Sequence, residues 1–241
     1  MSKPELDYRI APQHDARAYA QFFRKFGRLH IPNFLREQDA QSLYDALAFR
    51  TPWRLMLIHD GPQEITGEAW AAMPAEERQK IDRDVIEAAK VRFEGRFCEL
   101  RFSDDGEIYG GDIPELTALS RFLNSPPFLA FIRTLTESPD IALADAQATL
   151  YRPGDFLHRH NDIYAGKNRV AAYVYNLTPR WQAEWGGLLG FLDQDGHVAE
   201  AYTPTWNALN ILRVPQMHYV SHVAPFAVNG RYSVTGWLRR K

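Results

Sequence analysis

The chain has 241 residues, of which 45% are hydrophobic and 24% charged, with a formal net charge of -2. These values are typical of a globular protein with one large core. No apolar run approaches the ~18 residues of a membrane helix, and the near-neutral charge argues against phosphate-backbone binding. Neither a membrane nor a nucleic acid is therefore expected as a partner. Nothing in the sequence fixes an oligomeric state.

Cysteine use also narrows the class of protein. Cys98 is the only cysteine, which excludes an internal disulfide and a cysteine-rich zinc or iron–sulfur site. The first ten residues, MSKPELDYRI, are charged and lack the apolar core of a secretory signal. We therefore expect a cytoplasmic location. Any metal would have to be bound by histidines and carboxylates.

The N-terminal part of the sequence predicts helices. Apolar residues recur every three or four positions from Ala18 to Phe26, and Gly27 is well placed to end that helix. The same spacing predicts further helices over residues 40–47, 76–89, 116–123 and 128–135. Apolar and charged residues alternate over residues 93–102, which favours a half-buried strand there over a substrate-side loop.

Short β-prone runs follow after about residue 145. They cover residues 147–151, 169–177, 188–192, 206–212, 219–223 and 231–238, with turn signals between them. The connections are too short for βαβ crossovers, so the sheet should be antiparallel and the fold class α+β. We predict a single domain over residues 1–241, with mainly helical support in 1–145 and a β core in 146–241.

The densest cluster of reactive side chains is His158-Arg159-His160-Asn161-Asp162. Residues two apart on a strand share a face, so His160 and Asp162 can both point at one metal ion. A third ligand must come from elsewhere, and His218 and His222 are the candidates. Together they would form the 2-His-1-carboxylate triad that leaves positions open on non-haem Fe(II).

A second constellation lies near the C-terminus. Arg231 and Ser233 share a strand face in Arg231-Tyr232-Ser233. An arginine fork beside a hydroxyl is suited to bind one carboxylate of a small diacid.

These segments resemble, in order, the motifs of the Fe(II)/2-oxoglutarate-dependent dioxygenases, specifically their prolyl-hydroxylase-like branch. The resemblance covers about residues 147–240. It includes Tyr151 with the following turn and His-x-Asp, Gly186-Gly187-Leu188, His222 with Pro225, and Arg231 through Trp237.

The resemblance implies a double-stranded β-helix, or jelly-roll, core buttressed by helices. It implies Fe(II), 2-oxoglutarate and O₂ as cofactors, with His160, Asp162 and His222 as iron ligands. Arg231 would bind the distal carboxylate of 2-oxoglutarate, helped by Tyr151 and Ser233. Asn176 aligns with a second family tyrosine. His222 lies nine residues before Arg231, a spacing typical of the family, which favours His222 over His218 as the distal ligand. His218 would then lie near the metal or the substrate.

The activity implied is hydroxylation of an unactivated carbon with release of succinate and CO₂. A prolyl residue of a protein or peptide is the favoured substrate, and a free amino acid or small metabolite is the alternative. A non-catalytic jelly-roll protein that binds or senses a metal is a rival from another class. A metal enzyme that does not use 2-oxoglutarate is a second rival, for which Arg231 would have no required role.

Overall fold

The computed structural model describes residues 6–58, 61–109 and 112–241. Its helices are α1 (Ala16–Phe26), α2 (Glu37–Phe49), α3 (Gly67–Ala72), α4 (Ala75–Ala89), α5 (Pro114–Leu123), α6 (Pro126–Thr136) and the 3-10 turn η1 (Ala183–Trp185). Its strands are β1 (Arg28–Ile31), β2 (Arg54–Ile58), β3 (Pro62–Thr66), β4 (Gly95–Asp104), β5 (Glu107–Ile108), β6 (Leu143–Ala144), β7 (Ala146–Tyr151), β8 (Phe156–His160), β9 (Arg169–Asn176), β10 (Leu189–Leu192), β11 (Val198–Tyr202), β12 (Ala208–Arg213), β13 (His218–Val220) and β14 (Arg231–Arg239).

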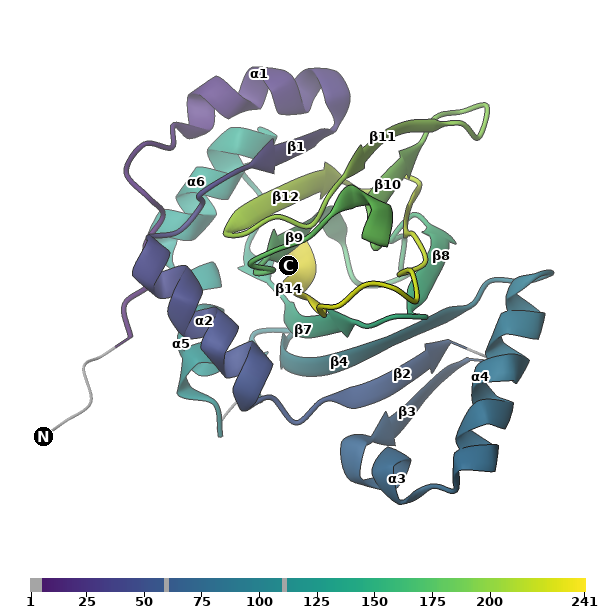
Figure 1. Ribbon diagram of the computed structural model, residues 1–241. Helices are drawn as coiled ribbons and strands as arrows, with labels where there is room; N and C mark the ends of the chain where they lie inside the picture. Colours follow the sequence, from purple (N-terminus) through teal and green to yellow (C-terminus); the bar gives the residue numbers. More distant parts are fainter. Residues whose placement is uncertain (1–5, 59–60, 110–111) are drawn as a thin grey trace, which may run out of the picture.

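The strands form an antiparallel sheet that curls into a nearly closed barrel (Figure 1). Its order is β1-β12-β9-β14-β7-β4-β8-β13-β10-β11. The two ends of this path meet where Arg28 of β1 pairs with Glu200 of β11 at 2.5 Å. Inside the barrel, Val174 and Leu212 of one wall pack against Phe191 of the other. The predicted α+β class with a jelly-roll core is confirmed.

Four helices, α1, α2, α5 and α6, cover one outer face of the barrel (Figure 1). They begin and end at local signals in the sequence. The side chain of Asp15 accepts a hydrogen bond from the backbone N–H of Arg17 at the start of α1. Gly27 ends that helix with a left-handed φ of 68° and donates its N–H to the carbonyl of Phe23. Among the described residues, no helix has the length and apolar character to cross a membrane.

The N-terminal half also contributes strands. The half-buried strand predicted over residues 93–102 is β4, and it joins the barrel between β7 and β8. Helix α4 packs Val85 against Cys98 and Leu150 on the outer face of β4 and β7. Strands β2, β3 and β11 and helix α3 were not predicted from the sequence. Most side chains of β3 and β11 are exposed, so these strands lack the apolar alternation that identifies a half-buried strand.

Candidate metal centre

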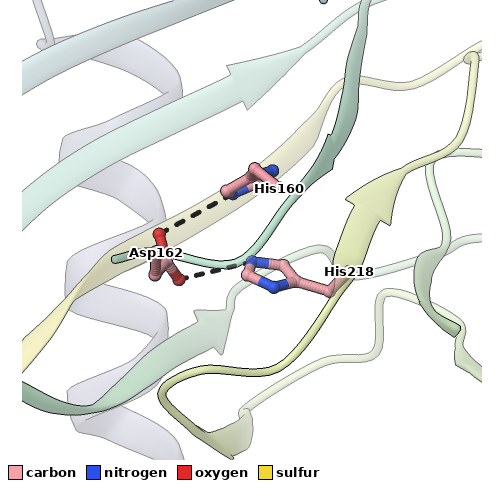
Figure 2. Close-up of side chains that lie close together, drawn as sticks. All are labelled: His160, Asp162 and His218. Atoms are coloured by element: carbon pink, nitrogen blue, oxygen red, sulfur yellow. Dashed lines mark ion pairs between the residues drawn. The ribbon is translucent and has the colours of Figure 1, made fainter. Parts of the chain in front are cut away.

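Three side chains from two adjacent strands converge inside one end of the barrel (Figure 2). His160 ends β8, Asp162 follows two residues later, and His218 begins β13. Asp162 Oδ1 lies 3.7 Å from His160 Nε2, and Asp162 Oδ2 lies 3.4 Å from His218 Nε2. Bonds of about 2.1 Å place neighbouring ligand atoms of a metal about 3 Å apart, so this cluster has nearly the required size.

The backbone sets the tautomer of both imidazoles. His160 Nδ1 lies 2.9 Å from the carbonyl oxygen of His158, and His218 Nδ1 lies 2.7 Å from that of Gln216. A carbonyl only accepts, so each Nδ1 carries the proton and donates it. Each Nε2 is then left with a free lone pair directed toward Asp162. This is how a second hydrogen bond orients a metal-binding histidine.

Burial also keeps His218 in the form that binds metals. Burial and the neighbouring His160 lower the pKa of His218 to about 4, although the Asp162 carboxylate acts in the opposite direction. His218 is therefore a neutral imidazole at neutral pH. A neutral imidazole beside a carboxylate suits a divalent first-row metal.

A β-bulge explains which histidine of β8 faces inward. Val220 of β13 lies opposite Leu157, but His218 lies opposite His160, so β8 spans three positions where β13 spans two. The extra residue turns both Leu157 and His160 toward the interior. His158 consequently faces outward, where its Nδ1 lies near the carbonyl of Arg92.

The structure does not bring His222 into this cluster. Strand β13 ends at Val220, and the exposed His222 ring lies 6.2 Å from the ring of Phe156 on the outer side of the barrel. It lines an outer groove of about 880 Å³, not the cavity that contains His160 and Asp162. The spacing to Arg231 does not identify the inward histidine, because the intervening segment is an extended loop.

A left-handed turn places Asp162 in the cluster. Strand β8 has already ended, and Asp162 has a φ of 62°, which is uncommon for a residue other than glycine. Arg169 at the start of β9 stabilises this turn, because its Nη1 donates to the carbonyl oxygen of Asp162 at 3.1 Å. The pattern His-x-Asp is thus correct in spacing, although Asp162 does not continue the strand.

The cluster lies at one end of an internal cavity of about 90 Å³, here called the barrel cavity. Arg231 and Tyr151 lie opposite each other in register on β14 and β7 and line the same cavity. The guanidinium of Arg231 lies 5.0 Å from the centre of the Tyr151 ring. Arg231 is 2% exposed, and no ion pair joins it to a carboxylate of the described residues. Its Nε has no hydrogen-bond partner.

Ser233 and Asn176 lie beside that arginine on the inner face of the sheet. Ser233 Oγ is 2.8 Å from the hydroxyl of Thr149, which lines the barrel cavity. Asn176 lies opposite Ser233 and is fully buried, yet neither its Oδ1 nor its Nδ2 has a partner. Tyr175 faces the other way, toward the helices, and donates to Asn207.

Two further polar groups near the metal end were not identified from the sequence. The guanidinium of Arg169 lies 3.5 Å from the ring centre of Trp237, which lines the barrel cavity. Arg169 Nε and Trp237 Nε1 are both buried without a hydrogen-bond partner. A tryptophan on a strand gives no sign in the sequence that its N–H is unpaired, and an arginine at the start of a strand gives none that its Nε is.

A second group of acidic side chains, Asp104, Asp105 and Asp145, is held by cations of the chain itself. Lys167 Nζ lies 3.0 Å from Asp104 and 2.7 Å from Asp105, and Arg239 pairs with Asp145 at 2.9 Å. These ion pairs attach the loop after Asp162 to β4. The group therefore needs no metal for charge balance.

Comparison with known proteins finds a matching family for the C-terminal part of the chain. Residues 146–239 match the family model described as the 2OG-Fe(II) oxygenase superfamily. Prolyl 3-hydroxylase OGFOD1 of Mus musculus is 27% identical over 162 residues, which are 63% of this chain and 29% of the mouse protein. This chain thus matches less than a third of the length of that relative.

Solved structures share the fold. A 2OG-Fe(II) oxygenase family oxidoreductase of Burkholderia pseudomallei has a TM-score of 0.63 at 16% identity, with 99% of this chain and 100% of that one covered. A Pseudomonas putida prolyl-4-hydroxylase has a TM-score of 0.56 at 18% identity, with 94% and 100% covered. Residues 146–239 thus resemble the 2OG-Fe(II) oxygenases, and a prolyl hydroxylase is among the similar proteins, as the sequence motifs indicate. The cofactors of this class are Fe(II), 2-oxoglutarate and O₂, as predicted.

Proposed function

We propose that the protein hydroxylates a prolyl residue of a protein or peptide and converts 2-oxoglutarate and O₂ to succinate and CO₂. His160, Asp162 and His218 would hold Fe(II), and Arg231 would hold the distal carboxylate of 2-oxoglutarate. One observation carries this proposal. The barrel cavity has a histidine–carboxylate cluster at one end and a buried arginine without a carboxylate partner at the other.

The charge of Arg231 supports an anionic ligand in the cavity. Burial of a guanidinium without a counter-charge costs several kcal/mol, because the ion loses its hydration. A carboxylate bound in the cavity would offset that cost through charge-assisted hydrogen bonds. The Tyr151 phenol lies beside the same position and is able to donate to a carboxylate oxygen. A dicarboxylate with a keto group next to one carboxylate fits both ends of the cavity.

Apolar side chains between the two ends of the barrel cavity would hold the co-substrate in position and exclude water from it. Leu157, Val174, Leu189 and Val220 line the cavity. They present no competing hydrogen-bonding group and exclude water from the bound ligand. When bound, the iron supplies the oxygen chemistry. The chain's own contribution is to bring His160, Asp162 and His218 together, where they would hold the metal.

Two unpartnered donors support a prolyl substrate. Arg169 Nε and Trp237 Nε1 offer N–H groups near Asp162 but no acceptor. A prolyl residue has no backbone N–H, so the backbone there presents only carbonyl acceptors. Exposed apolar side chains Phe93, Ile163 and Tyr164 near the metal end could contact the rest of a peptide. The exposed apolar side chains support a prolyl residue within a peptide over a free amino acid, which has no further residues to contact them.

The proposal is tested in two stages. Under anaerobic conditions, Fe(II) and 2-oxoglutarate together should give a weak metal-to-ligand charge-transfer band in the visible range. The loaded enzyme is then given proline-containing peptides and free proline, and mass spectrometry detects the gain of one oxygen atom. Absence of the band would overturn the co-substrate assignment. Hydroxylation of free proline with none of the peptides would overturn the peptide substrate.

A further inference from the structure

Glu99 is a buried carboxylate on the cavity side of β4. It lies directly opposite Thr149 of β7, which lines the barrel cavity. Directly opposed residues of an antiparallel pair share a face. Phe97, two residues before Glu99, lines the cavity as well, whereas Cys98 packs against α4 on the outer face. Glu99 therefore projects from the inner face of the barrel wall.

The Glu99 carboxylate has no partner in the protein. The residue is 6% exposed, and no hydrogen bond or ion pair joins its side chain to any other described residue. Arg54 lies opposite Glu99 on β2 and pairs with Glu64 at 3.3 Å, and Arg101 pairs with Asp104 at 3.5 Å. Burial raises the pKa of Glu99, which reflects the cost of holding its charge there.

Glu99 also lies on the inner face of β4 between the barrel cavity and the solvent. On this face Phe97 lines the cavity, Glu99 is buried and Arg101, two residues later, is exposed. Strand β4 pairs with β8 only through Gly95 and Arg96, and with β7 from Cys98 onward. This face of β4 therefore leads from the solvent past Glu99 to the cavity.

We propose that Glu99 determines substrate specificity by binding a cationic group, a lysine or arginine side chain of the substrate next to the hydroxylated residue. This inference rests on the proposed function, since it places the substrate beside the barrel cavity. A buried carboxylate without a counter-charge is costly, and a substrate cation would supply both the charge and the hydrogen bonds that the protein does not. The co-substrate would not bind at Glu99, because the Glu99 carboxylate would repel the carboxylates of 2-oxoglutarate.

The test uses one set of proline peptides that differ only in a flanking residue: lysine, glutamine or glutamate. Binding to the protein loaded with Mn(II) and 2-oxoglutarate is measured by calorimetry, and hydroxylation by the Fe(II) enzyme is measured separately. We expect the lysine peptides to bind about tenfold more tightly than the glutamate peptides, as charge pairing in a dry site requires. Glu99→Gln should abolish this preference, and Glu99→Lys should reverse it.

Glu76→Gln is the control. It removes an exposed carboxylate of α4 that does not line the barrel cavity, so the lysine preference should persist. Thermal melting confirms that each variant is folded. If the lysine peptides bind in a Glu99-dependent manner but are not hydroxylated, the prolyl assignment fails and the role of Glu99 stands. Equal binding of lysine and glutamate peptides, absent binding, or a preference that survives Glu99→Gln overturns this inference.

Discussion

His218 Nε2 lies 3.4 Å from Asp162 Oδ2, whereas His222, only four residues later, lies on the outer side of the barrel. His218 begins β13 and His222 follows its end, and only His218 is paired in register with His160. The metal-binding assignment therefore depends on where β13 begins and ends. Two single substitutions separate the candidates.

His218→Ala should lower the affinity for Fe(II) or Mn(II) by more than about 100-fold, because it removes one of three ligands. His222→Ala should change that affinity by less than about threefold, since it lies outside the cluster. Metal titration followed by calorimetry measures both. Succinate formation from 2-oxoglutarate should be lost in parallel. The reverse order of effects would show that the loop after β13 rearranges to bring His222 to the metal.

Replacement of Arg231 should separate binding from stability. Arg231→Met should weaken 2-oxoglutarate binding by about 100-fold, which corresponds to about 3 kcal/mol for charge-assisted bonds. The same change removes a buried unpaired cation, so the ligand-free protein should melt at a higher temperature. Calorimetry with 2-oxoglutarate and a thermal melt without it make the comparison.

Arg17→Met, on the exposed side of α1, is the control and should alter neither quantity. A ligand-free Arg231→Met protein that melts well below the wild type would mean that Arg231 has a structural partner. Unchanged affinity for 2-oxoglutarate would favour a metal enzyme that uses another co-substrate.

Local patterns predicted the helices other than α3 and η1, and much of the sheet. The spacing of apolar residues and the position of Gly27 gave the extent of α1, and alternation identified β4. The His160-x-Asp162 pair was found for a similar reason, because short-range spacing brings both residues to one point. These features depend on residues close together in the chain.

Features that depend on pairing between distant strands were not predictable in the same way. The bulge that turns His158 outward exists only because β8 pairs with β13. Glu99 lies in a strand whose alternation was recognised, but its lack of a partner depends on β7, β2 and the loop after Asp162. A sequence pattern indicates which face a residue occupies; it does not indicate whether its charge is satisfied there.

Trp237→Phe should test the substrate-side donors. Phenylalanine keeps an aromatic ring beneath the Arg169 guanidinium but removes the unpartnered N–H. We expect KM for a peptide substrate to rise by about tenfold, the effect of one lost hydrogen bond in a buried site. The affinity for 2-oxoglutarate should stay within twofold of the wild type, a change of about 0.4 kcal/mol or less. If only the affinity for 2-oxoglutarate changes and KM for the peptide does not, Trp237 contacts the co-substrate instead.

Cys98 should report on the packing of α4 against β4. Burial raises the pKa of its thiol to about 11, and Val85 lies in the same apolar cluster. At pH 8 we expect alkylation by iodoacetamide to be at least about 100-fold slower in the native protein than in urea, because little thiolate forms and access is blocked. Rapid native labelling would show that α4 opens frequently. Cys98→Ser provides the blank, as this is the only cysteine.

Glu99→Gln should stabilise the ligand-free protein in a pH-dependent way. Burial raises the folded-state pKa of Glu99 above its unfolded value, so the folded protein binds the proton more tightly. The contribution of Glu99 to stability is then fully present below the unfolded pKa and is lost as the pH rises through the folded pKa. At neutral pH the variant should be more stable by about 1 kcal/mol, or about 2–4 °C in melting temperature. The difference should vanish below about pH 4, where the wild-type side chain is protonated in both states. A variant that is less stable than the wild type at neutral pH would show that the Glu99 carboxylate already has a partner within the protein. A substrate cation would then not be needed to balance its charge.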